Sequence, residues 1–198
     1  LKHIGIVGGG FSAALQPIQL LRRAGGRVTL IERAERVARG AAYGTTRPEH
    51  LLNVRASGMS AFPDEPDHFA RWLERQGEGD GTTFAQRRTY GRYMGELLES
   101  GGERLTIVRG EAVDVLPGEA IRLADGGTIE ADAAILSIGN LPPEVPRGLD
   151  GLGDIYVPDP WAGDIAAGLD DTDTVLLIGT GLTAVDAALT LYAAGFGG

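Results

Sequence analysis

The first 32 positions follow a pattern of one apolar run, a helix-like stretch and a second apolar run. His3–Val7 is short, apolar and bounded by glycine, which is typical of a buried parallel strand. Residues 14–24 have the composition and spacing of a helix, and we expect Pro17 to kink this helix without ending it. Arg27–Glu32 is the second apolar run and ends in an acid. The pattern predicts strand, helix and strand in succession.

The middle of the chain predicts two helices and a group of short strands. Residues 33–62 have no clear period, and an irregular segment of this length inside a compact domain is usually functional. Asp67 is expected to cap a helix that buries Phe69, Trp72 and Leu73. We interpret Trp72 as a core residue and not as a cofactor contact. A helix is expected at 90–98, a hairpin turn at 125–127, and strands at 105–108, 112–116, 120–123, 128–129 and 132–138.

A glycine signature, Gly8-x-Gly10-x-x-Ala13, stands where the first strand turns into the helix. Gly8 permits the tight turn, Gly10 lets a pyrophosphate approach the backbone, and Ala13 lets the helix pack on the strand. Glu32 follows Gly10 by 22 residues, close to the spacing of about 20 expected for an acid that binds ribose. These features together favour a dinucleotide site over a turn that only packs, and a ribose role for Glu32 over a solvated acid.

A second signature, Gly179-x-Gly181-x-x-Ala184, follows the apolar run at 174–178 and precedes a helix-like stretch at 182–194. This order predicts a second strand, phosphate turn and helix. Only 17 residues follow Gly181, whereas a βαβ unit needs roughly 30. We therefore expect the chain to be a fragment that stops inside its second nucleotide site.

The charged residues are unevenly distributed. All 18 Lys and Arg residues lie in residues 1–147, whereas residues 148–198 contain 8 aspartates and no basic residue. The net charge of −9 disfavours nucleic-acid binding, which requires a basic stripe. The chain has no cysteine, which excludes a dithiol relay within it. Without an apolar run of about 18 residues or a signal peptide, we expect a cytoplasmic protein and no membrane partner.

The paired signatures are typical of flavoproteins that take hydride from NAD(P)H. The chain resembles the two-dinucleotide-binding flavoproteins, and more narrowly the FAD/NAD(P)-binding family related to flavin-containing and N-hydroxylating monooxygenases. The most specific part of the resemblance is Leu52-Asn53-Val54, followed by Met59 and the Phe-Pro-Asp-Glu-Pro turn at 62–66. In flavin monooxygenases a similar Asn, a Met and a Phe-x-Asp-x-Pro-like turn lie by the flavin ring.

This resemblance implies an α/β fold with a Rossmann-like FAD-binding domain, an inserted antiparallel β element and the start of a second Rossmann-like, NAD(P)-binding domain. We expect the FAD-binding domain at 1–145, a crossover linker at 146–173 and the beginning of the NAD(P)-binding domain at 174–198.

The resemblance also implies roles for individual residues. The first signature would hold the FAD pyrophosphate and the second that of NAD(P)H, while Glu32 would bind the adenosine ribose. Val113 would place its backbone against adenine. Gly139 belongs to a Ser-Ile-Gly sequence that stands where these families often have Ala-Thr-Gly and where the chain closes over FAD. Met59 would lie by the flavin. Asn53 is the implied catalytic residue, since its amide would hydrogen-bond the flavin ring. Without the resemblance, Asn53 would be interpreted as a residue that caps a turn.

We therefore expect an FAD-dependent oxidoreductase that accepts hydride from NAD(P)H, with monooxygenation of a small nitrogen or sulfur nucleophile by oxygen as its reaction. One alternative is a reductase or dehydrogenase that passes electrons to a protein or quinone. Another is a non-enzymatic FAD-binding module, and a single-cofactor NAD dehydrogenase explains the long middle segment poorly.

The three histidines predict neither a metal site nor a general base. They are scattered along a chain without cysteine, which disfavours a metal cluster. His50 and His68 have no acid at a recognisable spacing, so we interpret both as surface or turn residues.

Overall fold

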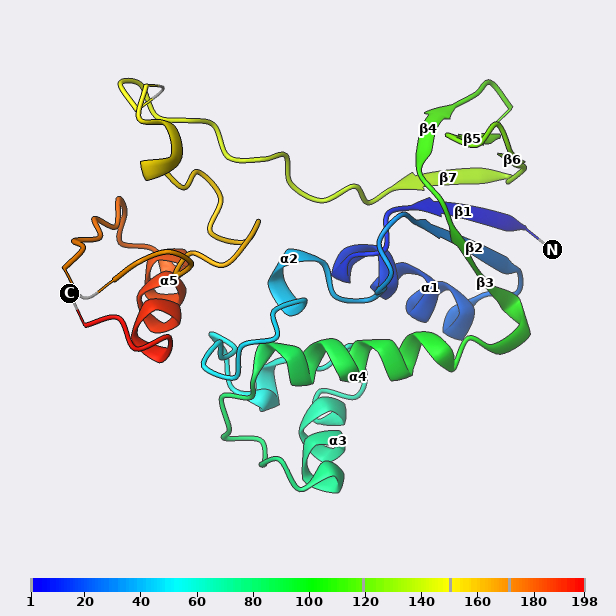
Figure 1. Ribbon diagram of the computed structural model, residues 1–198. Coiled ribbons are helices and arrows are strands. Elements are labelled where there is room, and N and C mark those ends of the chain that lie inside the picture. The colour runs from blue at the N-terminus through cyan, green and yellow to red at the C-terminus, as the bar shows by residue number, and fades with distance from the viewer. Residues whose placement is uncertain (1, 119, 150, 171, 198) are drawn as a thin grey trace. The chain divides into compact units, whose positions relative to one another are not determined.

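The computed structural model describes residues 2–118, 120–149, 151–170 and 172–197 (Figure 1). The chain divides into two compact units. The first contains Leu1–Thr46 and Leu51–Gly139, and the second contains Arg47–His50 and Asn140–Gly198. The segment of four residues at 47–50 therefore belongs with the C-terminal part of the chain, although the sequence on both sides of it belongs to the first unit.

A parallel sheet of four strands forms the centre of the first unit. The strands lie in the order β3-β2-β1-β7, and all three neighbouring pairs are parallel. Their bounds are β1 His3–Val7, β2 Arg27–Glu32, β3 Leu105–Arg109 and β7 Ala133–Leu136. The two apolar runs of the first 32 residues are thus adjacent strands, which confirms the α/β prediction.

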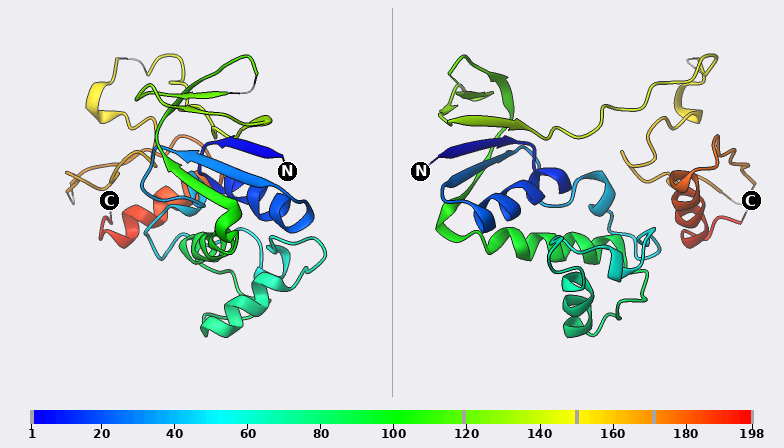
Figure 2. Two further views of the ribbon diagram at one scale, coloured as in Figure 1. Left: turned by 90° about the vertical axis from the view of Figure 1, so that its right-hand side faces the viewer. Right: turned by 180° about the vertical axis from the view of Figure 1, so that it is seen from behind.

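Three helices lie on one side of this sheet (Figures 1 and 2): α1 Phe11–Arg23, α3 His68–Gln76 and α4 Arg87–Glu99. Helix α1 continues through Pro17, which is buried. The expected apolar face of α3 is confirmed, since Phe69, Trp72 and Leu73 are buried in the core of this unit. Helix α4 begins one turn earlier than the apolar pattern predicts, because its first turn, from Arg87, is polar.

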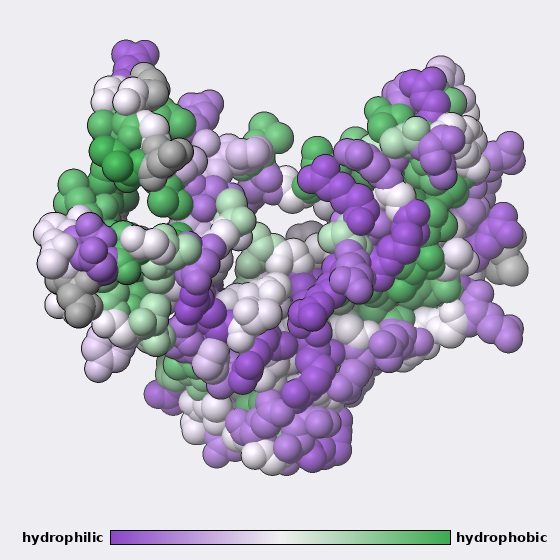
Figure 3. All heavy atoms as spheres, in the orientation of Figure 1, coloured by the Kyte–Doolittle hydropathy of each residue, from purple (hydrophilic) through white to green (hydrophobic). Residues whose placement is uncertain are grey.

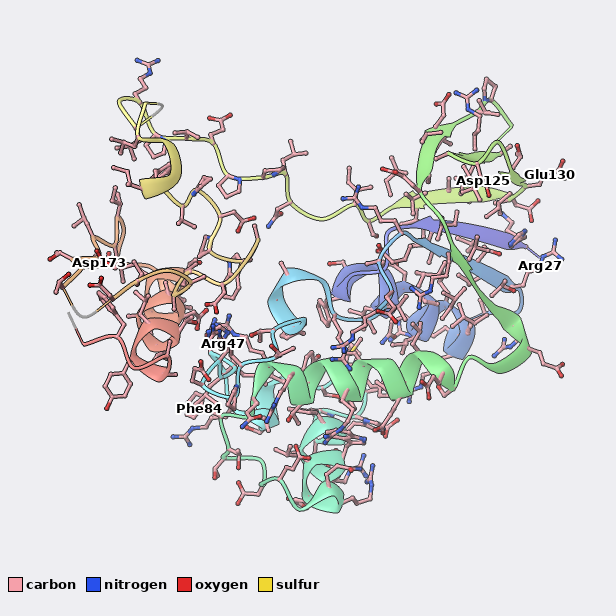
Figure 4. The ribbon with its side chains drawn as sticks, in the orientation of Figure 1. Arg27, Arg47, Phe84, Asp125, Glu130 and Asp173 are labelled. Atoms are coloured by element: carbon pink, nitrogen blue, oxygen red, sulfur yellow. The ribbon has the colours of Figure 1, made fainter. Side chains whose placement is uncertain are left out.

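The opposite face of the sheet is covered by a small antiparallel sheet, with strands β4 Ala112–Val115, β5 Ile121–Leu123 and β6 Thr128–Ile129. Ile121 and Leu123 pack on Ile31 of β2 in a second, smaller core. A side chain on Gly5 would overlap the end of Ile121, so the absence of one lets β5 lie directly against β1. Asp125 lies in the predicted hairpin turn between β5 and β6 (Figure 4).

Short elements connect these layers. Residues 33–62 contain only α2 Gly40–Tyr43 and the 3-10 helix η1 Ala56–Gly58, in agreement with the irregular pattern of the sequence. A second 3-10 helix, η2 Gly102–Arg104, precedes β3.

The second unit contains the 3-10 helix η3 Gly153–Ile155 and helix α5 Leu182–Ala193. The strand expected at 174–178 is not formed, and the described residues of this unit include no strand that could pair with it. A strand needs a neighbour to satisfy its backbone hydrogen bonds, so the apolar run stays irregular. Leu176 is 80% and Ile178 64% exposed, and apolar side chains of this unit reach the surface in Figure 3.

His50 is not the surface residue that we expected. It is only 3% exposed, because its imidazole packs within the second unit, with Nε2 2.9 Å from the Thr190 hydroxyl oxygen. Its neighbour in sequence Arg47, marked in Figure 4, forms an ion pair of 2.9 Å with Asp164. No helix in the described parts of the chain is long and apolar enough to cross a membrane.

Candidate functional site

The first glycine turn connects the end of β1 to the start of α1. Gly8 has a φ of +104°, a conformation that side chains rarely adopt, and a Cβ atom there would overlap the carbonyl oxygen of Ser137. The Gly8 N–H donates to the carbonyl of Ile31 at 2.8 Å. Gly8 is therefore required by the protein itself, since both its backbone conformation and its close approach to Ser137 exclude a side chain.

Gly10 differs from Gly8 in both respects. Its φ of −71° and ψ of −172° are open to any residue, and an added Cβ would meet only the Cα of Gly40, at an ordinary 3.6 Å. No side chain caps α1 within the described part of the chain, and the first turn of the helix contains no acid. No side chain therefore satisfies the N–H groups at this helix end, where an anion is favoured by both the hydrogen bonds and the helix dipole.

The carboxylate of Glu32 lies beside the same turn. One oxygen accepts a hydrogen bond from the N–H of Gly9, and the other accepts from the N–H of Ala34 at 2.7 Å. A carboxylate oxygen has two lone pairs, so each oxygen keeps one acceptor site after these bonds. A fixed pair of acceptors at the end of β2 fits the two hydroxyl groups of a ribose.

The segment that follows β2 forms the wall of the turn. Ala38 donates its N–H to the carbonyl of Gly9 at 2.8 Å, and Gly40 lies against Gly10. The ring of Phe11, the residue after Gly10, lies 5.1 Å from that of Tyr43 in α2. Tyr43 in turn contacts Tyr90 of α4, with the ring centres 4.8 Å apart. The packing connects the glycine turn to α4 through aromatic rings.

The absence of a side chain at Gly91 in α4 makes this packing possible. A Cβ on Gly91 would lie only 2.7 Å from the Tyr43 carbonyl oxygen. Burial raises the pKa of Tyr43, and the positive charge of Arg87 partly opposes that rise. Burial also raises the pKa of Tyr90, so both phenols stay neutral at physiological pH.

Asn53 lies outside the turn but is connected to α4. Leu51 and Gln86 form an antiparallel bridge, and the N–H of Leu52 donates to the carbonyl of Ala85 at 2.8 Å. Arg87 donates from Nε to the Leu51 carbonyl at 2.9 Å and from Nη2 to the Asn53 side-chain oxygen at 3.3 Å. The Asn53 side chain is exposed.

The other residues of the first unit that are expected to contact the cofactor differ in how exposed they are. Val113 is 54% exposed and is the extra residue of a bulge in β4, because its neighbours Ala112 and Asp114 pair with consecutive residues of β5. The bulge leaves its backbone outside the ladder. Gly139 is exposed, with a φ of +77°, and follows β7 closely. Met59 is half-buried against the main core.

The second glycine turn, in the other unit, has the same backbone geometry as the first. Gly179 has a φ of +118°, and Gly181, which precedes α5, has a φ of −77° and a ψ of 178°. A Cβ on either residue would meet no described atom within 4 Å. No side chain caps α5 in the described part of this unit, as none caps α1.

Comparison with known families identifies the first unit. The model of a family described as FAD-NAD(P)-binding matches residues 5–141, which include the first glycine turn, Glu32 and the strands up to β7. The chain belongs to this FAD-NAD(P)-binding family. Its cofactors, FAD and NAD(P)H, are those that the sequence predicts.

Solved structures that resemble this FAD-NAD(P)-binding protein share a low sequence identity with it. The Diels-Alderase PyrE3 of pyrroindomycin biosynthesis is 16% identical, with 70% of this chain and 32% of that chain covered and a TM-score of 0.49. S-allyl-L-cysteine S-oxygenase from Allium sativum is 21% identical, with 68% and 36% covered and a TM-score of 0.49. The ferredoxin reductase for the CYP199A2 system from Rhodopseudomonas palustris is 17% identical, with 71% and 24% covered and a TM-score of 0.39.

The chain therefore spans about a third or less of the length of each of these three structures. A search of curated proteins gives no match.

Several residues of this FAD-NAD(P)-binding protein that surround the turn or contact Asn53 were not predicted from its sequence. They are Ala38, Gly40 and Tyr43, which pack around the turn, and Arg87, which contacts Asn53. The sequence pattern gives no signal for Arg87, because the helix that it predicts at 90–98 begins after this residue. The described residues contain no cluster of His, Asp or Glu that could hold a metal ion.

Proposed function

We propose that this protein is an FAD-dependent oxidoreductase in which the first glycine turn holds the FAD pyrophosphate and the second holds that of NAD(P)H. When bound, FAD would take hydride from the nicotinamide and pass the electrons to an acceptor. The protein's own residues would bind, orient and shield the cofactors.

The geometry of Gly10 carries this proposal. Neither its backbone conformation nor its neighbours require a glycine, in contrast to Gly8. A glycine at the start of a helix with uncapped N–H groups leaves room for a group that is not part of the protein. A pyrophosphate fits this space because it is an anion that must approach the backbone closely.

Glu32 supplies the second point of attachment. Its oxygens are already fixed by the N–H groups of Gly9 and Ala34, so the side chain loses little freedom on binding. We assign its remaining acceptor sites to the adenosine ribose. The unpaired backbone of Val113 would receive the adenine, and the chain from Ser137 to Gly139 would close over the cofactor.

The flavin ring would lie by Asn53 and Met59. Asn53 offers an exposed amide that Arg87 holds, and we propose it as the catalytic residue. Met59 is half-buried and would provide an apolar contact. The second turn, with Gly179, Gly181 and Ala184 at the start of α5, would hold NAD(P)H within a domain that begins at 174.

We further propose that the electron acceptor is oxygen and that the reaction is monooxygenation of a small nitrogen or sulfur nucleophile. This assignment rests on the Asn, Met and Phe-Pro-Asp-Glu-Pro sequence at 53–66. We also propose the domain bounds expected from the sequence, with an FAD-binding domain at 1–145 and a crossover linker at 146–173.

Stopped-flow reduction tests this function. The FAD-loaded protein is mixed with NADH or NADPH without oxygen, and bleaching of the flavin band is followed. Reduction, followed by oxygen-dependent reoxidation that transfers oxygen to an amine or thioether, is the expected result. Reduced flavin that reacts with a quinone and not with oxygen would overturn the monooxygenase proposal, and flavin that stays oxidised would overturn the oxidoreductase proposal.

A further inference from the structure

Asn53 is held in place by the start of α4. The segment at 51–53 runs antiparallel to residues 85–87, with the Leu51–Gln86 bridge and the bond from Leu52 N–H to the Ala85 carbonyl. This pairing brings the Asn53 side chain beside Arg87, the first residue of the helix.

Arg87 is an unusual residue at this position. It is only 9% exposed, and the first turn of α4 contains no acid. A positive charge at a helix N-terminus opposes the helix dipole, and burying a guanidinium has a desolvation cost. Its hydrogen bonds to the Leu51 carbonyl at 2.9 Å and the Asn53 side chain at 3.3 Å offset part of this cost.

The chemistry of Arg87 decides which way the Asn53 amide points. A guanidinium has five N–H donors and no acceptor. The group of Asn53 that faces Arg87 must therefore be its oxygen, and the NH₂ group must point away from Arg87. Asn53 thus presents two hydrogen-bond donors on its exposed side, and a bound group must offer an acceptor atom to meet them.

The same arginine lies near the proposed cofactor site. Helix α4, which begins at Arg87, packs through Tyr90 on the Tyr43 ring, with the ring centres 4.8 Å apart. The Tyr43 ring contacts the ring of Phe11, the residue that follows Gly10 of the glycine turn. The helix that begins at Arg87 is therefore connected to the turn through two aromatic contacts.

We infer that Arg87 is a positioning residue, which fixes the Asn53 amide so that its NH₂ group donates to an acceptor atom of the bound flavin ring. This inference rests on the proposed function. Donors directed at the ring stabilise electron density that the ring gains on reduction. Removing Arg87 would let the amide rotate, and the flavin would become harder to reduce.

A double-mutant cycle on the midpoint potential of the bound FAD tests the inference. The variants are Arg87→Met, Asn53→Leu and the two combined. Each single change is expected to make the potential more negative and to shift the visible flavin bands. The double variant should show no larger shift than Asn53→Leu alone, because Arg87 acts through Asn53. Arg87→Lys, which keeps one donor, should restore part of the shift.

Arg88→Met is the matched control. Arg88 lies on the same helical turn and is exposed, and it bonds Gln86 and the carbonyl of Thr46, not Asn53. This variant should leave the potential and the spectrum unchanged. A thermal melt of each apo-protein separates loss of fold from loss of positioning.

The outcomes are distinct. Independent, additive shifts from Arg87→Met and Asn53→Leu would overturn the inference, because Arg87 would then act without Asn53. If Arg87→Met does not fold, an unchanged potential and spectrum in Asn53→Leu would also overturn it. A wild-type protein that takes up no FAD would instead overturn the proposed function.

Discussion

The carboxylate of Glu32 accepts a hydrogen bond from the backbone N–H of Gly9, so the acid at the end of β2 is tied to the middle of the first glycine turn. The bond from Ala34 N–H to the other oxygen, at 2.7 Å, fixes the orientation of the carboxylate. Glu32 and the first glycine turn are thus hydrogen-bonded parts of one arrangement at the carboxyl end of the sheet. This is the edge of a parallel sheet at which ligands of such folds bind.

Replacing Glu32 by Ala should weaken FAD binding. The loss should be about 1.5 to 3 kcal/mol, the range for hydrogen bonds to a charged group, or roughly ten- to hundredfold in Kd. Titration of the apo-protein with FAD, followed by quenching of flavin fluorescence, measures it. Glu35→Ala, an exposed acid in the same loop, is the control and should leave Kd unchanged. An unchanged Kd in Glu32→Ala would refute the ribose role.

The two glycines of the first turn should respond differently to Ala. Gly8→Ala forces a side chain into a φ of +104° and against the Ser137 carbonyl, so it should lower the free energy of unfolding by on the order of 1–3 kcal/mol. Gly10→Ala meets no such strain and should change it by less than about 0.5 kcal/mol. Urea denaturation of the two apo-proteins compares them. Equal losses would show that Gly10, too, serves the fold.

His68 should make stability depend on pH. Its Nδ1 lies 2.8 Å from the Tyr93 hydroxyl oxygen, and the same oxygen accepts from the N–H of Ala61. Burial lowers the pKa of His68, although Glu65 partly opposes this. The folded state therefore disfavours the protonated ring, and the contribution of neutral His68 is complete above the ordinary pKa of 6.5 and decreases as pH falls below it.

Comparing the free energy of unfolding of wild type and His68→Gln between pH 5 and pH 8 checks this prediction. The wild type should lose stability relative to the variant as the pH falls below the ordinary histidine pKa. A difference between the two proteins that is independent of pH would contradict the assignment of a neutral His68.

Gly181→Val should abolish NAD(P)H binding and leave FAD binding unchanged. Gly181 has an open backbone conformation and no described neighbour within 4 Å of an added Cβ, so the variant should fold and keep its FAD. The new side chain would occupy the space where the second turn is proposed to receive the NAD(P)H pyrophosphate. Anaerobic reduction by NAD(P)H should therefore be lost, while chemical reduction by dithionite is retained. Reduction by NAD(P)H at the wild-type rate would contradict the role of this turn.

The strands that could be predicted from sequence are those for which the fold supplies a neighbouring strand. β1, α1 and β2 were predicted because each apolar run lies next to the helix and the strand that bury it. The apolar run at 174–178 has equally good composition, but the described residues of its unit supply no neighbouring strand, so the prediction of a strand was wrong.

Contacts between distant segments were beyond the reach of the sequence pattern. The sequence predicts His50 to be a surface or turn residue. It is buried instead, and its imidazole contacts the hydroxyl group of Thr190, 140 residues away. The Arg87 contact with Asn53 depends on the antiparallel pairing of two irregular segments, which no periodicity indicates. The glycines were recognisable as a motif, whereas the difference in role between Gly8 and Gly10 required their backbone angles and neighbours.

The central claim is tested most directly by comparing the visible absorption spectra of wild type and Gly10→Val. Each purified protein is mixed with FAD and then freed of unbound cofactor. We predict that the wild type keeps the flavin bands with one FAD per chain and that Gly10→Val, folded by circular dichroism, keeps none. Flavin in equal amount in both proteins would contradict the account, because the space beside Gly10 would then not be the site of the cofactor.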